Sequence, residues 1–160
     1  MDADIENFLK TKAIDFINRK WCAVYLILDE DALDSNEFII LAYFTLSHRC
    51  IIPQSDINPS KIKKITGGFV TAPMLHFVLI GQLGKRIELL SDGNYKKANI
   101  SGKEILDYIF EIVEEANDLI PCRCVLIECS QEAKLQEFYK QNGFKFLQQD
   151  EDLYQFYKPI

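Results

Sequence analysis

The sequence predicts an α/β fold in which strands and helices alternate, and three observations support that class. Met74–Arg86 is apolar enough to form a central strand of a sheet. Helix, strand and helix patterns follow one another from residue 101 to residue 142, which is the alternation typical of α/β proteins. Pairs of adjacent strands near both ends of the chain indicate hairpins. The expected order is α-β-β-α-β-α-β-α-β-β, with no internal repeat and one domain over residues 1–160.

The composition is that of a soluble globular protein of one ordinary domain. The chain has 160 residues, of which 48% are hydrophobic and 26% are charged. No apolar run approaches the ~20 residues that span a bilayer, so no membrane association is expected. The segment MDADIENFLK opens with acidic residues and lacks the basic and apolar regions of a signal peptide. We therefore expect a cytoplasmic protein.

Net charge bears on the expected partner, and the cysteines bear on whether a metal site is expected. The net charge of −6 counts against a nucleic-acid partner, which prefers a basic face, although a local basic patch would suffice. The five cysteines are expected to be reduced thiols that pack as small hydrophobic groups. They show no metal-ligand spacing, so no metal site is predicted. The cysteines are Cys22, Cys50, Cys122, Cys124 and Cys129.

The first half of the chain predicts a helix followed by a hairpin. Apolar residues recur at helical spacing over Asp4–Lys20, which indicates an amphipathic helix. Ala23–Leu28 and Phe38–Ile52 are rich in β-forming residues and are expected to pair. The charged run Glu30–Asp34 between them predicts a solvated loop.

A short helix is expected before the central strand, and two glycines lie within it. A short helix is expected to begin at Ser60 and to end at Gly67 and Gly68. Gly81 and Gly84 lie near the end of the central strand, where glycine suggests a bulge or a close backbone approach.

The second half predicts two helices, a strand and a closing hairpin. Glu88–Gly102 is polar and is expected to be a flexible loop before a helix from about Ser101 to Leu119. The strand CRCVLIECS follows, and Ser130 is expected to cap the next helix, which ends at Asn142 and Gly143. The segments FKFLQQ and LYQFYKPI are expected to form the last hairpin.

A strand, a polar glycine-containing loop and a helix start form the unit most suggestive of chemistry. The first turn of a helix exposes unpaired N–H groups and the positive end of its dipole. A loop such as Lys97–Gly102 can therefore hold a pyrophosphate through its backbone. The residues alone favour the plainer interpretation, an ordinary capped helix start.

The whole order of elements resembles the GNAT family of acetyl-CoA-dependent N-acetyltransferases. The sharpest part of the resemblance is EFYKQNGFKF, within LIECSQEAKLQEFYKQNGF, which is similar to the end of the family's core. APMLHFVLIGQLGK is similar to the family's central strand, particularly in a subgroup of toxins that act on aminoacyl-tRNA. The resemblance covers nearly the full chain. It implies a mixed, mostly antiparallel sheet of about six to seven strands flanked by helices.

The resemblance also implies the roles of individual residues. Leu83, Gly84 and Lys85 are expected to hold the pantetheine arm of acetyl-CoA and to polarise the thioester carbonyl. The expected pyrophosphate contacts are Lys97, Asn99, Ile100, Ser101, Gly102 and Lys103. The usual pattern there is Gln/Arg-x-x-Gly-x-Gly/Ala, whereas this chain has Lys97 at the first position and Ile100 in place of the middle glycine. Tyr139 is expected to support the leaving CoA thiolate, while spacing alone favours a packed aromatic with a satisfied hydroxyl.

The predicted function is direct transfer of an acetyl group from acetyl-CoA to a primary amine, without a covalent enzyme intermediate. The expected acceptor is a small molecule or a peptide, with nucleic acid less favoured because the chain is acidic. One alternative is a toxin that acetylates aminoacyl-tRNA. The other is a GNAT-like binding or regulatory module that binds CoA poorly. A homodimer is expected by analogy with the family, and the acceptor and the general base are not predicted.

Overall fold

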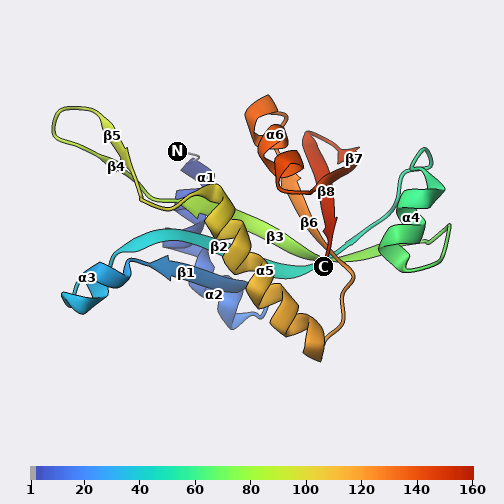
Figure 1. Ribbon diagram of the computed structural model, residues 1–160, viewed down its shortest axis with the longest axis horizontal. Helices are drawn as coiled ribbons and strands as arrows, with labels where there is room; N and C mark the ends of the chain where they lie inside the picture. The colour runs from blue at the N-terminus through green and yellow to red at the C-terminus, as the bar shows by residue number, and fades with distance from the viewer. Residues whose placement is uncertain (1–2) are drawn as a thin grey trace. The chain divides into compact units, whose positions relative to one another are not determined.

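The computed structural model describes residues 3–160 and has a mixed α/β fold (Figure 1). The chain divides into two compact units. One contains the described residues up to 47 together with 81–109, and the other contains residues 48–80 and 110–160. Among residues 3–160, no helix is both long enough and apolar enough to cross a membrane. The prediction of one domain over residues 1–160 stays a prediction.

The strands form a six-stranded sheet and a separate two-stranded sheet. The larger sheet has the hydrogen-bonded order β1-β2-β3-β6-β8-β7, and the smaller consists of β4 and β5. Pairs β1–β2, β6–β8 and β7–β8 are antiparallel, whereas β3 and β6 are parallel. This confirms the predicted mixed, mostly antiparallel sheet. The strands are β1 (Ala23–Leu28), β2 (Ile40–Ile51), β3 (Leu75–Lys85), β4 (Ile87–Leu89), β5 (Tyr95–Lys97), β6 (Cys124–Cys129), β7 (Lys145–Asp150) and β8 (Leu153–Pro159).

The N-terminal helix of the first unit is interrupted by a wider turn. The expected helix over Asp4–Lys20 is divided into α1 (Ala3–Asn7), the π-helical segment η1 (Phe8–Lys12) and α2 (Ala13–Asn18). The Ala13 N–H donates to the Phe8 carbonyl, which is the i→i+5 bond of a π-turn. Apolar side chains from these segments pack with Tyr43 of β2 in a small core.

Two segments of the first unit that were predicted to be loops form regular structure. Glu30–Asp34 is the helix α3 rather than a solvated loop, because the Asp29 carboxylate accepts the Ala32 N–H at 3.2 Å and caps the helix. The polar segment after β3 begins with the β4–β5 hairpin rather than a flexible loop. An Asp92-Gly93-Asn94 turn closes this hairpin: Gly93 has φ +82° and the Asn94 N–H donates to Asp92 Oδ1 at 2.9 Å.

The second unit packs α4 (Pro59–Thr66) on one core, with Ile62 and Ile65 buried among strand residues that include Phe77 and Leu126. Gly67 ends α4 with φ +78°, as expected. The helix α6 (Ala133–Gln141) starts after Glu132, which makes no side-chain capping bond, so the predicted cap at Ser130 is wrong.

The end of α6 lies where the sequence predicts it. Asn142 is the C-cap residue that follows Gln141, and Gly143 comes next with φ +86°. The remaining helix of the fold is α5 (Gly102–Leu119), whose first half belongs to the first unit.

Candidate functional site

A cavity of about 630 Å³ lies in the first unit, beside the end of β3. Its wall is mostly apolar and contains the three residues predicted to hold the pantetheine arm. Four charged side chains also line it, which places both signs of charge around an apolar space. The lining residues are Ile5, Glu6, Leu9, Lys10, Phe38, Ile40, Ala42, Tyr43, Leu83, Gly84, Lys85, Arg86 and Ile87.

Gly84 lets the N-terminal helix approach the backbone of β3. A Cβ at this position would lie 2.6 Å from Ile5 Cγ2 and 3.0 Å from Tyr43 Cε1, which is too close for any larger residue without movement. Gly81 is similarly constrained, since its Cβ would lie 2.7 Å from Thr45 Oγ1. The close backbone approach predicted at both glycines is confirmed.

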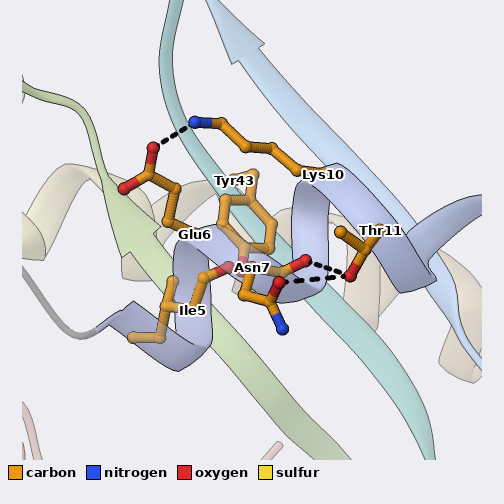
Figure 2. A network of polar contacts seen from close by, with 6 residues as sticks. All are labelled: Ile5, Glu6, Asn7, Lys10, Thr11 and Tyr43. Carbon is orange, nitrogen blue, oxygen red and sulfur yellow. Dashed lines mark hydrogen bonds and ion pairs between the residues drawn. The ribbon is translucent and has the colours of Figure 1, made fainter.

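A polar network fixes the helical wall of the cavity, as Figure 2 shows. The Tyr43 hydroxyl donates to the Ile5 carbonyl and so connects β2 to α1. Glu6 and Lys10 form an ion pair one helical turn apart. The Thr11 hydroxyl donates to the Asn7 carbonyl at 2.7 Å. Sequence reasoning missed Glu6 and Lys10 as site residues, and their i,i+4 spacing was the only available signal.

A capping box satisfies backbone N–H groups at the start of α5. The Ser101 N–H donates to Glu104 Oε2 at 2.7 Å, and the Glu104 N–H donates to Ser101 Oγ at 3.1 Å. The hydrogen bonds from Ser101 lower the pKa of the Glu104 carboxyl below its ordinary value. An anionic carboxylate is therefore already bound where the resemblance places a pyrophosphate.

Ile100 is a buried residue just before α5, and it fixes the start of that helix. Its side chain is 7% exposed, and its N–H donates to the Ala98 carbonyl at 2.9 Å. The Ile100 carbonyl accepts a hydrogen bond from the Lys85 ammonium. Lys85, Ile100 and Ser101 are thus brought together, and the end of β3 is connected to the start of α5.

The other predicted pyrophosphate contacts do not converge on one point. Lys97 lies on β5 opposite Ile87, and its side chain is exposed, as is that of Asn99. Lys103 forms an ion pair with Asp107 at 2.5 Å, one turn further along α5. Gly102 is the first residue of that helix. Their roles toward CoA stay predictions.

Tyr139 lies on α6 in the second unit and is 5% exposed. Its ring contacts the rings of Phe138 and Phe144, with centroids 5.2 and 5.6 Å away. Its hydroxyl has no hydrogen-bond partner among residues 3–160. The only buried side-chain nitrogen or oxygen without a partner in that range is Gln155 Oε1, so the Tyr139 oxygen keeps some exposure to solvent.

The surroundings of Tyr139 keep it protonated. Burial raises the pKa of its hydroxyl far above the ordinary value, and the nearby Cys129 thiol raises it further. A hydroxyl that is protonated, unpartnered and partly open to solvent can donate a hydrogen bond to an incoming anion. No protein group among residues 3–160 accepts or donates a hydrogen bond at this hydroxyl, so the packed aromatic and the thiolate-facing role both stay predictions.

Comparisons with known proteins identify solved structures of similar fold. No family model and no curated protein matches the chain. AtaT complexed with acetyl-methionyl-tRNAfMet is 19% identical with a TM-score of 0.71, and the alignment covers 99% of this chain and 83% of AtaT. AtaTR bound with AcCoA is 21% identical with a TM-score of 0.69, covering 99% and 81%.

A third similar structure extends the comparison to another protein. A tyrosine-to-phenylalanine mutant of KacT is 17% identical with a TM-score of 0.68, covering 99% of this chain and 82% of KacT. Identities this low establish the fold alone. The chain therefore shares its mixed α/β fold with AtaT and KacT.

Proposed function

We propose that this protein is an acetyl-CoA-dependent N-acetyltransferase whose acceptor is the amino group of an aminoacyl-tRNA. The observation that carries the proposal is similarity of fold over 99% of the chain to AtaT with acetyl-methionyl-tRNAfMet and to AtaTR with AcCoA. This similarity favours the toxin alternative over the small-molecule or peptide acceptor expected from the sequence. The acidic composition counted against a nucleic acid, but the local charge of the cavity is mixed.

The proposed reaction is direct acyl transfer. The neutral amine attacks the thioester carbonyl, the C–N bond forms, the C–S bond breaks, and the amine loses a proton. Backbone groups at Leu83–Lys85 would stabilise the developing oxyanion, because strand N–H groups are suitable donors. Tyr139 would donate a hydrogen bond or a proton to the leaving thiolate, since its hydroxyl is protonated and unpartnered.

The start of α5 favours a second candidate function, a module that binds CoA weakly or not at all. Glu104 already accepts the Ser101 N–H, and Ile100 is buried where the family pattern has glycine. Two anions near the same helix start repel each other, so the capping box disfavours a pyrophosphate there. This candidate predicts no measurable affinity for acetyl-CoA.

Two measurements separate these functions. Calorimetric titration with acetyl-CoA and CoA tests the cofactor, and micromolar binding is expected of an enzyme. Transfer of radiolabelled acetyl groups is then measured with an aminoacyl-tRNA, a polyamine and a peptide as acceptors. Labelling of the aminoacyl-tRNA alone supports the proposal. Labelling of the polyamine or the peptide would instead support the small-molecule or peptide acceptor expected from the sequence. Absence of acetyl-CoA binding at millimolar concentration refutes the enzyme and favours the module.

A further inference from the structure

One face of the β4–β5 hairpin continues from the wall of the cavity. Ile87 pairs with Lys97, and Leu89 pairs with Tyr95. Directly opposed residues of an antiparallel pair share a face, and alternate residues along each strand return to it. These four side chains therefore share one face, which we call the hairpin face. Because Ile87 lines the cavity, the hairpin face leads outward from it.

The hairpin face presents an aromatic and apolar surface to solvent. The Tyr95 side chain is 71% exposed and that of Leu89 is 63% exposed. A two-stranded sheet has no second layer to cover such a pair, and an isolated hairpin is only marginally stable in water. An exposed tyrosine beside an aliphatic side chain is a suitable platform for a flat ring.

The charges of the hairpin leave its lysines available to an anion. The Asp92 carboxylate accepts hydrogen bonds from the backbone N–H and the side-chain amide of Asn94 at the turn. Glu88 forms an ion pair with Arg86 at 3.5 Å. Lys96 and Lys97 form no ion pair within residues 3–160. Lys97 lies on the hairpin face beside Tyr95, whereas Lys96 lies on the opposite face across from Glu88. The hairpin face of this protein of net charge −6 therefore combines one lysine with one tyrosine.

The base of the hairpin is held in a defined position within its unit. The Arg86 N–H donates to the Leu41 carbonyl at 2.9 Å, and the Ala98 N–H donates to the Arg86 carbonyl at 3.0 Å. Figure 1 shows the two short strands extending directly from the end of β3. The hairpin face and the cavity therefore keep their relative orientation at the base of the hairpin.

We propose that the hairpin face binds the unpaired nucleotides of a nucleic acid whose reactive end enters the cavity. Tyr95 stacks on a base, and Lys97 contacts a phosphate. Base stacking on aromatic residues and phosphate contact by lysine are the means by which proteins bind single strands. A phosphate fits Lys97, which forms no ion pair within residues 3–160, and a base fits the exposed Tyr95 ring, so a single-stranded nucleic acid matches both side chains of the hairpin face. The inference rests on the proposed function, since it identifies where the acceptor of that reaction binds.

The test is fluorescence anisotropy with a labelled acceptor-stem RNA that ends in four unpaired nucleotides. The same RNA with a blunt, fully paired end is the comparison probe. Tyr95→Ala is expected to weaken binding of the unpaired-end RNA about tenfold and to leave blunt-end binding unchanged, because stacking needs an unpaired base. Tyr108→Ala removes another exposed tyrosine, 47% exposed on α5, and is expected to leave both affinities unchanged. Thermal unfolding verifies that both variants are folded.

Each remaining outcome has a definite meaning. Equal affinity of Tyr95→Ala and Tyr108→Ala for the unpaired-end RNA refutes the inference, as does tighter binding of an acidic peptide than of RNA to the native protein. Calorimetry with acetyl-CoA is performed in parallel. If acetyl-CoA does not bind but RNA binding depends on Tyr95, the enzyme proposal fails and the nucleic-acid surface remains. If acetyl-CoA binds and RNA binding is independent of Tyr95, only the hairpin inference fails.

Discussion

Ser101 and Glu104 exchange two hydrogen bonds across the first turn of α5, from each backbone N–H to the other residue's side chain. The arrangement stabilises the helix, since it satisfies donors that the first turn leaves unpaired. It also places a carboxylate at the positive end of the helix dipole. Any phosphate of a cofactor that binds at this turn must compete with that carboxylate.

Glu104→Gln is therefore expected to raise the affinity for acetyl-CoA several-fold. The glutamine retains the reciprocal hydrogen bonds but removes the negative charge, so the free energy of unfolding should change by less than about 1 kcal/mol. Isothermal calorimetry measures the affinity, and Glu111→Gln removes a similar exposed carboxylate further along α5 as a control. An unchanged or weaker affinity in Glu104→Gln alone would show that no phosphate binds at this turn.

Tyr139→Phe is expected to lower the rate of acetyl transfer about 100-fold, since a positioned proton donor contributes at least that much. Stability should change little, because the hydroxyl has no protein partner to lose. The rate is measured under single-turnover conditions with saturating acetyl-CoA. Tyr157→Phe, at another buried tyrosine of the second unit, is the matched control. Equal rates in the two variants would leave Tyr139 as a packing residue.

Gly84→Ala is expected to destabilise the protein by about 1–3 kcal/mol, the usual cost of overpacking. The new Cβ would overlap Ile5 Cγ2, so α1 must move away from β3 and change the cavity. Urea unfolding measures the loss. Ile5→Ala combined with Gly84→Ala removes the clashing methyl and should recover part of it. A double variant that loses the sum of the two single losses would exclude this contact as the cause.

Lys97→Ala distinguishes the two roles considered for this lysine. A contact with the CoA pyrophosphate predicts weaker acetyl-CoA binding with unchanged RNA binding. The hairpin inference predicts the reverse, with the salt dependence of RNA binding reduced by about one phosphate contact. Both affinities are measured on the same protein preparation, with Lys64→Ala as an exposed-lysine control on α4.

Two buried thiols are expected to lower stability in alkaline solution, in addition to the buried tyrosines whose pKa values are also raised. Burial raises the pKa of Cys124 and of Cys129 to about 11, from an ordinary value of 9.0. Well below pH 9 both thiols are protonated in either state, so these two thiols add no pH dependence to stability there. Between pH 9 and about 11 the unfolded thiols lose protons that the folded thiols keep, so the free energy of unfolding decreases. Urea unfolding at pH 7, 9 and 10.5 measures the decrease, which Cys124→Ala should reduce.

The periodic and apolar segments of the fold are predictable from local pattern. The central strand, the helix over residues 102–119 and the helix end at Gly143 follow from apolar spacing and from glycine's freedom at positive φ. The hairpin at Asp92-Gly93-Asn94 was also visible in principle, because Asp-Gly is a turn signal. It was missed because its flanking strands are only three residues long and mostly polar.

Local pattern alone determined the long apolar strands and the longer helices, and it indicated that β3 meets another element closely at Gly84. Packing decided the chemistry of each candidate residue. Ile100 is a buried anchor and Lys85 binds its carbonyl, relationships that join residues fifteen positions apart. Whether Tyr139 has a satisfied hydroxyl depends on neighbours brought to it by folding, since burial and hydrogen bonding are properties of the assembled core. Sequence spacing describes one element at a time, whereas a site is made where several elements meet.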